Sequence, residues 1–123
     1  MKELTRAEEQ VMQIVWKLKK CFVNDVIDHF PAPKPAYTTV STMIRILETK
    51  GFVGHKAYGK THEYFPLIAR EKYTRFYLNG VMKGHFDGSF HNLVSFFASE
   101  NKLSVHEIDE LVKHLKELKK DKQ

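Results

Sequence analysis

Cysteine and long apolar runs are both scarce in this chain of 123 residues. Cys21 is the only cysteine, so it cannot form an internal disulfide or supply a multi-cysteine metal site, and a reducing cytoplasm is the expected compartment. The longest stretch without Asp, Glu, Lys or Arg covers residues 88–99, which is 12 residues, whereas a membrane span needs roughly 20. The first residues also lack the apolar core of a signal peptide, so we expect no direct membrane insertion.

Motifs for catalysis are missing as well. Catalysis would need a nucleophile with a base, a carboxylate pair or a cofactor loop. Gly59 is an isolated turn glycine, and Gly84 and Gly88 form no phosphate-binding loop. The seven histidines repeat no known metal-ligand motif. We therefore expect no enzymatic activity, no cofactor and no metal site.

The composition includes enough apolar residues for a core, at 42% hydrophobic and 28% charged. The formal net charge of +5 permits a polyanionic partner without demanding one. The placement of the charge is more informative than the total. Residues 49–62 contain three lysines and two histidines and no acidic residue, so they predict a positively charged strip.

Three helices are predicted in the first half of the chain. Thr5 and Glu8 form a capping box, and apolar residues at helical spacing continue the first helix to Leu18. A shorter second helix covers 23–30, before the prolines of residues 31–35. The third covers 37–50 and ends at Gly51, which can adopt a left-handed conformation.

The third helix carries a polar stripe opposite its apolar face, made of Thr38, Ser41, Thr42, Arg45 and Thr49. Short hydroxyl side chains and an arginine can approach base edges and phosphates closely. Residues 52–57 and 61–65 then read as two strands around a glycine turn. Three helices followed by a hairpin are the order of a winged helix-turn-helix, in which the third helix enters the major groove and the hairpin lies along the DNA backbone.

The second half of the chain is predicted to be helical and to form a dimer. Three apolar stripes at helical spacing predict three helices, joined by loops at 84–88 and 99–103. A capping box at Ser104 and Glu107 predicts the start of the last helix. Such faces usually bind a second copy of the chain, although a tail that folds back on the first domain is the alternative. We thus expect a mainly α fold with a small β wing: a DNA-binding domain at 1–68 and a helical dimerisation domain at 69–123. The predicted dimer contacts are Tyr73, Phe76, Tyr77, Val81, Phe90, Leu93, Val94, Phe97, Ile108, Leu111 and Leu115.

Four segments carry a family resemblance that covers essentially the whole chain. They are LTRAEEQVMQIVW at 4–16, YTTVSTMIRILETKGFV at 37–53, HEYFPLIAREKY at 62–73 and GSFHNLVSFFA at 88–98. In these segments the chain resembles the penicillinase repressor family of bacteria, with its BlaI, MecI and copper-responsive CopY branches. The resemblance implies a dimeric winged-helix repressor on an operator that overlaps a promoter. In the beta-lactam branch, a membrane sensor with a zinc protease domain triggers cleavage of the repressor in its dimerisation region.

The family's recognition helix maps onto residues 38–45, with two departures from the usual pattern. Many members have Lys or Arg in place of Ser41, and their helix arginine commonly aligns with Ile46 rather than Arg45. The resemblance therefore implies the binding mode but not the operator sequence. Residues and resemblance together predict these DNA contacts: Thr38, Thr39, Ser41, Thr42, Arg45, Lys50, Lys56, Tyr58, Lys60 and His62.

The bond cleaved in the beta-lactam branch joins Asn to Phe and aligns here with Phe96 and Phe97. This chain keeps the phenylalanine and lacks the asparagine. Two interpretations therefore stay open: cleavage at this bond, and a purely structural role of Phe97 in the dimer core. The C-terminal LKELKKDKQ lacks the cysteine pair of the copper branch, which excludes copper sensing through that motif. The expected function is a homodimeric repressor on a palindromic operator. The alternative is a winged-helix protein-interaction module or antirepressor, which the polar stripe and acid-free wing disfavour.

Overall fold

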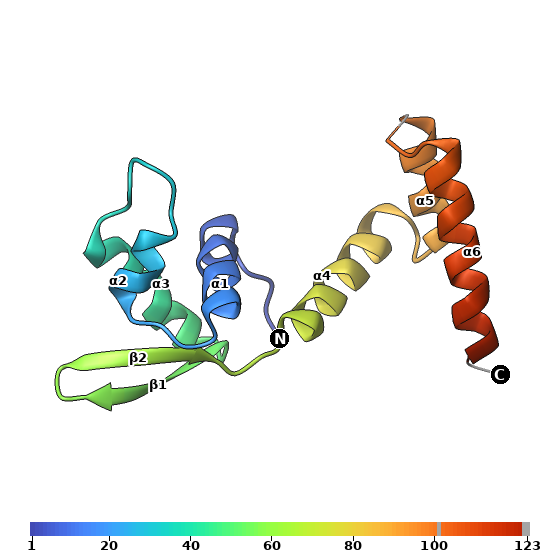
Figure 1. Ribbon diagram of the computed structural model, residues 1–123. Coiled ribbons are helices and arrows are strands. Elements are labelled where there is room, and N and C mark those ends of the chain that lie inside the picture. Colours follow the sequence, from blue (N-terminus) through green and yellow to red (C-terminus); the bar gives the residue numbers. More distant parts are fainter. Residues whose placement is uncertain (101, 122–123) are drawn as a thin grey trace. The chain divides into compact units, whose positions relative to one another are not determined.

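The computed structural model describes residues 1–100 and 102–121, and its elements follow the predicted order (Figure 1). Three helices lead into a hairpin, and three further helices follow, which confirms the mainly helical fold with a two-stranded wing. Two compact units divide the chain within the fourth helix, at Met1–Tyr77 and Leu78–Gln123. The elements are α1 Arg6–Leu18, α2 Val23–Asp28, α3 Tyr37–Thr49, β1 Val53–Tyr58, β2 Thr61–Pro66, α4 Arg70–His85, α5 Phe90–Ser99 and α6 Val105–Asp121.

The predicted capping box starts α1. The Thr5 hydroxyl accepts a hydrogen bond from the Glu8 amide at 3.2 Å, and the Glu8 carboxylate accepts one from the Thr5 amide at 2.9 Å. Two amides that have no partner within the helix are satisfied in this way. Glu8 is buried, which is unusual for a carboxylate and indicates a second partner for its charge.

The loop between α2 and α3 is held by one lysine. The ammonium of Lys34 donates to the carbonyl oxygens of Asp28 at 3.0 Å, Phe30 at 3.1 Å and Ile27 at 3.3 Å. These carbonyls lie at the C-terminal end of α2, where a cation is favoured by the helix dipole. Lys34 therefore closes α2 and shapes the turn that leads into the third helix.

The wing is an antiparallel hairpin of β1 and β2 that runs beside α2 and α3 (Figure 1). Val53 pairs with Pro66 at its base and Tyr58 with Thr61 at its tip, where Gly59 adopts a φ of 64°. Cys21 forms an isolated antiparallel bridge with Tyr64, because its amide donates to the Tyr64 carbonyl at 2.9 Å and its carbonyl accepts from the Tyr64 amide at 2.7 Å. The segment between α1 and α2 is thus tied to the base of the wing.

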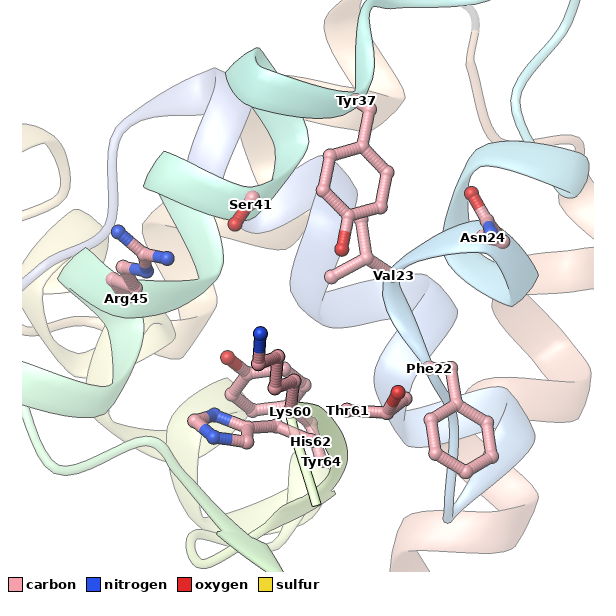
Figure 2. Close-up of a pocket in the computed structure, with 10 residues that line it drawn as sticks. All are labelled: Phe22, Val23, Asn24, Tyr37, Ser41, Arg45, Lys60, Thr61, His62 and Tyr64. Carbon is pink, nitrogen blue, oxygen red and sulfur yellow. The ribbon is translucent and has the colours of Figure 1, made fainter. Parts of the chain in front are cut away.

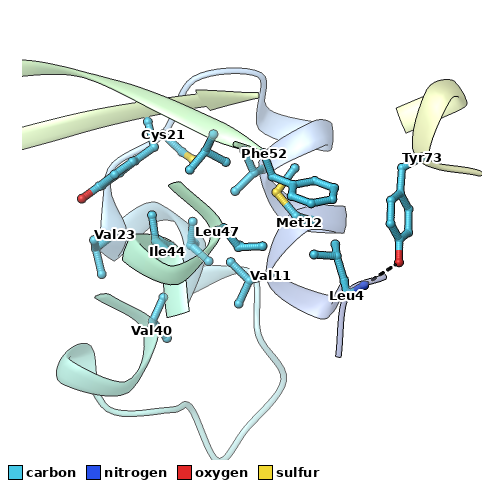
Figure 3. Packing of buried hydrophobic residues seen from close by; sticks show 14 residues of the cluster. Leu4, Val11, Met12, Cys21, Val23, Val40, Ile44, Leu47, Phe52 and Tyr73 are labelled. Atoms are coloured by element: carbon cyan, nitrogen blue, oxygen red, sulfur yellow. Dashed lines mark hydrogen bonds between the residues drawn. The ribbon is translucent and has the colours of Figure 1, made fainter. Parts of the chain in front are cut away.

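The core of the first unit joins α1, α3 and the start of the wing (Figure 3). Val11 and Ile44 are completely buried in it, as the helical spacing predicts, and so is Phe52 before β1. Tyr73, from the first turn of α4, also lies in this core, where its ring contacts Phe52 at a centroid distance of 5.5 Å. The Tyr73 hydroxyl accepts a hydrogen bond from the Leu4 amide at 2.9 Å. The first turns of α4 therefore complete the core of the first unit.

The second unit is built from capped helices with largely exposed apolar side chains. Ser89 caps α5, and the predicted cap at Ser104 is confirmed, since its hydroxyl accepts from the Glu107 amide at 3.1 Å. Gly88, with a φ of 73°, bonds through its amide to the Met82 carbonyl at 2.8 Å and so ends α4. None of the ten residues of α5, all of which the structure describes, is buried within the chain.

Candidate nucleic-acid interface

The polar face of α3 is open to solvent over its whole length. Val40, Ile44 and Leu47 fix the opposite face in the core, with no exposed surface. The predicted base-reading side chains Thr38, Thr39, Thr42 and Arg45 are exposed, and Ser41 is half-buried. A helix anchored by one apolar face can present the other as a rigid surface. The structure therefore brings these five predicted DNA contacts together on one surface.

A polar cleft of about 110 Å³ separates α3 from the wing (Figure 2). Ser41 and Arg45 form the α3 wall, and Lys60 and His62 form the wing wall. Among the residues that line it, all within the described part of the chain, none is Asp or Glu. Cations from two elements thus converge where a polyanion can approach. The lining residues are Phe22, Val23, Asn24, Tyr37, Ser41, Arg45, Lys60, Thr61, His62 and Tyr64.

Aromatic contacts hold the tip of the wing. The Tyr58 ring lies 6.4 Å from that of Phe22 at the start of α2, and the Lys56 ammonium lies 5.2 Å from the Tyr58 ring centroid. Half of the Tyr58 surface remains exposed. Lys56 and Tyr58, both predicted DNA contacts, are therefore neighbours at an exposed tip. Phe22, which no sequence motif indicated, supports that tip from α2.

Lys50 has a different environment from the other predicted contacts. Its ammonium donates to both carboxylate oxygens of the buried Glu8, at 2.7 and 2.9 Å. The structure therefore places Lys50 in an ion pair across the fold and not with the free cations of the wing. From the placement of charge alone, the sequence predicted a DNA contact for Lys50. It could not predict the pairing with Glu8, because the two residues lie 42 positions apart and no local pattern links them.

Two histidines and a glutamate link α3 to the wing behind the cleft. The rings of His55 on β1 and His62 on β2 stack with centroids 4.1 Å apart and planes 7° apart. The Nδ1 of His55 donates to the carboxylate of Glu48 on α3. His62 was predicted as a contact, whereas sequence reasoning missed Glu48. Residues 48 and 55 share no helical or strand period that could have paired them.

The environment of Tyr64 confirms that opposite charges gather at this junction. Burial raises the pKa of the Tyr64 phenol above its ordinary value, and the nearby carboxylate of Glu48 raises it further. The guanidinium of Arg45 partly offsets both effects. Tyr64 is neutral at physiological pH and lies between the acidic and basic groups that face the wing.

The predicted dimer residues fall into three groups. Tyr73 is buried inside the first unit with 3% of its surface exposed, and Phe76 packs against the same core, so neither presents a free face. Tyr77, Phe90 and Phe97 are exposed by 40%, 50% and 40%. The side chain of Leu115 lies outside the described residues. The remaining ones are half-buried: Val81, Leu93, Val94, Ile108 and Leu111.

The bond between Phe96 and Phe97 lies inside α5. Both side chains are exposed, by 49% and 40%, and the Phe96 ring packs edge-on against Phe86 at 5.8 Å. A protease binds its substrate in extended form, so cleavage here requires α5 to unwind locally. Exposure makes the side chains accessible, whereas the helix protects the bond itself.

Neither a metal-ligand cluster nor a membrane-spanning helix occurs among the described residues. Over residues 1–100 and 102–121, no group of three or more His, Cys, Asp or Glu side chains is placed to hold a metal ion. Cys21 is buried, and burial together with Asp25 and Glu63 raises the pKa of its thiol to about 11. No helix in the described part of the chain is long and apolar enough to cross a membrane.

Comparisons with known proteins cover nearly the whole chain. The family model described as penicillinase repressor matches residues 4–117. The methicillin resistance regulatory protein MecI of Staphylococcus aureus (strain N315) is 32% identical over 114 residues, covering 89% of each chain. The penicillinase repressor of Bacillus licheniformis is 29% identical over 125 residues, covering 98% of this chain and 94% of its own.

A solved structure shows the same architecture for the first unit. The solution structure of the DNA-binding domain of the repressor BlaI aligns with a TM-score of 0.50 and 30% identity, over 59% of this chain and 94% of that domain. Sequence matches along the chain and this structural match agree with the resemblance carried by the four segments. The chain belongs to the penicillinase repressor family of DNA-binding transcriptional repressors, which are not enzymes.

Proposed function

We propose that the chain represses transcription as a homodimer on a palindromic operator, with α3 in the major groove and the wing on the backbone. The observation that carries this proposal is the acid-free cleft between α3 and the wing, where Ser41 and Arg45 face Lys60 and His62. Hydroxyl and guanidinium groups suit base edges, and lysines suit phosphates. A role on DNA places the protein in the cytoplasm, as the scarcity of cysteine suggests.

The base-reading role of α3 can be tested with Thr42→Ala combined with Arg45→Ala. Both side chains are exposed, so the variant should fold normally. We expect loss of operator-specific binding, because one bidentate arginine contact is worth about 1–3 kcal/mol of discrimination. An operator fragment selected from genomic DNA serves as the probe in a gel-shift titration. Gln10→Ala on α1, also exposed, is the matched control, and unchanged operator affinity of the double variant would reject the assignment.

Dimerisation is supported by the exposed aromatic side chains of the second unit. Phe90 and Phe97 leave about half of their surface uncovered within one chain. Apolar groups of that size are usually covered by a partner, and a two-fold dimer matches the symmetry of a palindromic site. Phe97→Glu should shift the sedimentation equilibrium to monomer and weaken operator binding. Ser99→Glu on the same helix adds the same charge at an exposed polar position and should leave the dimer intact.

Relief of repression by cleavage of the repressor is supported by the resemblance to the beta-lactam branch. The bond between Phe96 and Phe97 is the aligned position, and a membrane sensor-protease is the proposed partner. Mass spectrometry of the repressor from induced cells should show a fragment ending at Phe96. A Phe96→Pro variant should resist cleavage but also breaks α5, so Phe97→Leu is needed as a milder variant that keeps the helix. Induction without any fragment would contradict this mode of relief.

A further inference from the structure

The cleft between α3 and the wing has the size and chemistry of a site for one oxyanion. Its volume is about 110 Å³, well below the roughly 300–1,000 Å³ typical of pockets for organic ligands. Lys60 from the turn and His62 from β2 line one wall, and Arg45 from α3 adds positive charge on the other (Figure 2). A phosphate group carries the negative charge and the acceptor oxygens that suit this set of groups.

The ring of His62 is held in place by a stack. His55 lies flat against it at 4.1 Å, and the Nδ1 of His55 is bound to Glu48. An ionised carboxylate can only accept, so this bond keeps a proton on His55 Nδ1 and fixes the plane of the His55 ring. Glu48 is engaged by His55, while His62 remains on the wall of the cleft. His55 is therefore a positioning residue for His62.

Other charged and titratable groups face His62 from three elements. An oxyanion seated among two cations and an imidazole interacts more favourably with the protonated ring than with the neutral ring. The start of α2 contributes only Phe22, Val23 and Asn24 to the cleft, none of which titrates. The groups around His62 are Tyr37, Arg45 and Glu48 from α3, His55 from β1, Tyr64 from β2, and Lys60 from the turn before β2.

We propose that Lys60 and His62 form a proton-linked phosphate subsite, with Arg45 on the opposite wall adding positive charge while its guanidinium reads a base edge. One backbone phosphate of duplex DNA enters the cleft, and His62 takes up one proton from solvent as the phosphate binds. The proposal rests on the proposed function, in which duplex DNA is the partner. By linkage, the affinity for duplex DNA increases as the pH falls through the range in which histidine titrates.

The test measures the dissociation constant of the full chain between about pH 6 and pH 8 at constant ionic strength. The probes are a fluorescent mixed-sequence duplex and a duplex selected in vitro. The wild-type affinity of the dimer should increase with falling pH, by at most about a hundredfold per pH unit for one linked proton in each chain. His62→Gln should flatten this dependence and lower the salt slope by about 1 per chain, or about 2 per dimer. Calorimetry in buffers of different ionisation enthalpy should show about one proton taken up per chain by the wild type and none by the variant.

Control variants separate the subsite from general effects. His106→Gln changes an imidazole on α6 whose side chain is 82% exposed, and it should keep the wild-type pH dependence. His55→Phe keeps a ring beneath His62 and should retain the dependence, whereas His55→Ala removes the stack and should weaken binding. A wild-type affinity that does not change with pH, or a His62→Gln dependence equal to wild type, would overturn the subsite and leave DNA binding standing. Failure to bind either duplex at any pH would overturn the proposed function itself.

Discussion

The ammonium of Lys50 lies 2.7 Å from a carboxylate oxygen of Glu8, which joins the C-terminal end of α3 to the first turn of α1. The side chain of Glu8 is only 7% exposed and that of Lys50 only 21%. The same carboxylate also closes the capping box with Thr5. One buried acidic group therefore caps the first helix and ties it to the end of the third.

Glu8→Ala should destabilise the first unit strongly. The change removes one hydrogen bond of the capping box and leaves Lys50 partly buried without its partner. Loss of one member of a buried pair costs about 3–5 kcal/mol, and the partial exposure of Lys50 lowers the expected loss to about 2–4 kcal/mol. Urea unfolding provides the measurement. Glu9→Ala, in the same turn but less buried, should stay within about 1 kcal/mol of wild type, and equal losses for both variants would contradict this role.

The same ion pair predicts how stability depends on pH. Burial raises the pKa of Glu8, but the hydrogen bonds from Lys50 and Thr5 and the charge of Lys50 outweigh burial and lower the pKa below its ordinary value of 4.5. The folded state then binds the proton less readily than the unfolded state. The ionised Glu8 carboxylate therefore stabilises the fold above its ordinary pKa, and this stabilisation is lost as the pH falls through the lower pKa of the folded state. Between neutral and acidic pH, the free energy of unfolding should therefore decrease less for Glu8→Gln than for wild type. Urea titrations at several pH values provide the measurement. Equal decreases for the two proteins would argue against a stabilising ion pair.

The order of elements could be predicted because each element carries a local signal. The caps at Thr5 and Ser104 and the turn at Gly59 act over a few residues, and the structure confirms them, although at Ser104 the Glu107 carboxylate is bound by the hydroxyl instead of the amide. Contacts between distant residues have no such signal. Glu8 with Lys50, and Glu48 with His55, become neighbours only when α1, α3 and the wing pack together. Sequence reasoning therefore found the surface of the candidate site and missed the groups that hold it in place.

The apolar residues at helical spacing after residue 69 also show that sequence patterns do not reveal contacts between distant residues. Helical spacing placed Tyr73 in one stripe with Tyr77 because a period gives the face of a helix but not what covers that face. The structure covers Tyr73 with Phe52 and Trp16 from the first unit and leaves Tyr77 exposed. A domain boundary drawn from sequence at residue 68 therefore separates Tyr73 from the core to which it belongs.

This observation predicts how fragments should behave. A fragment of residues 1–77 keeps Tyr73 and should fold as a monomer, whereas residues 1–68 should be less stable by about 3 kcal/mol or more, as for loss of a buried aromatic side chain. Tyr73→Phe in the longer fragment removes only the hydroxyl that the Leu4 amide binds and should cost about 1–3 kcal/mol. Thermal and urea unfolding would compare the three proteins. Equal stability of the two fragments would show that Tyr73 adds nothing to the core.

Cys21 provides an internal probe of this unit. Its side chain is 1% exposed, and burial with the charges of Asp25 and Glu63 raises the pKa of the thiol to about 11. At about pH 8 the folded chain should react very slowly with iodoacetamide, because the thiolate is the nucleophile. The same thiol in concentrated urea should react at the rate of a free cysteine. Rapid labelling of the native chain would show that the base of the wing is open.

The pairing of Cys21 with Tyr64 has a consequence for local unfolding. An isolated two-stranded hairpin is marginally stable in water, but here its base shares backbone hydrogen bonds with the segment that precedes α2. Opening the base of the wing must also release that segment, and with it the start of the helix-turn-helix. We therefore expect the wing and the helices between residues 21 and 64 to open as one cooperative unit, so that the two walls of the cleft are lost or kept together.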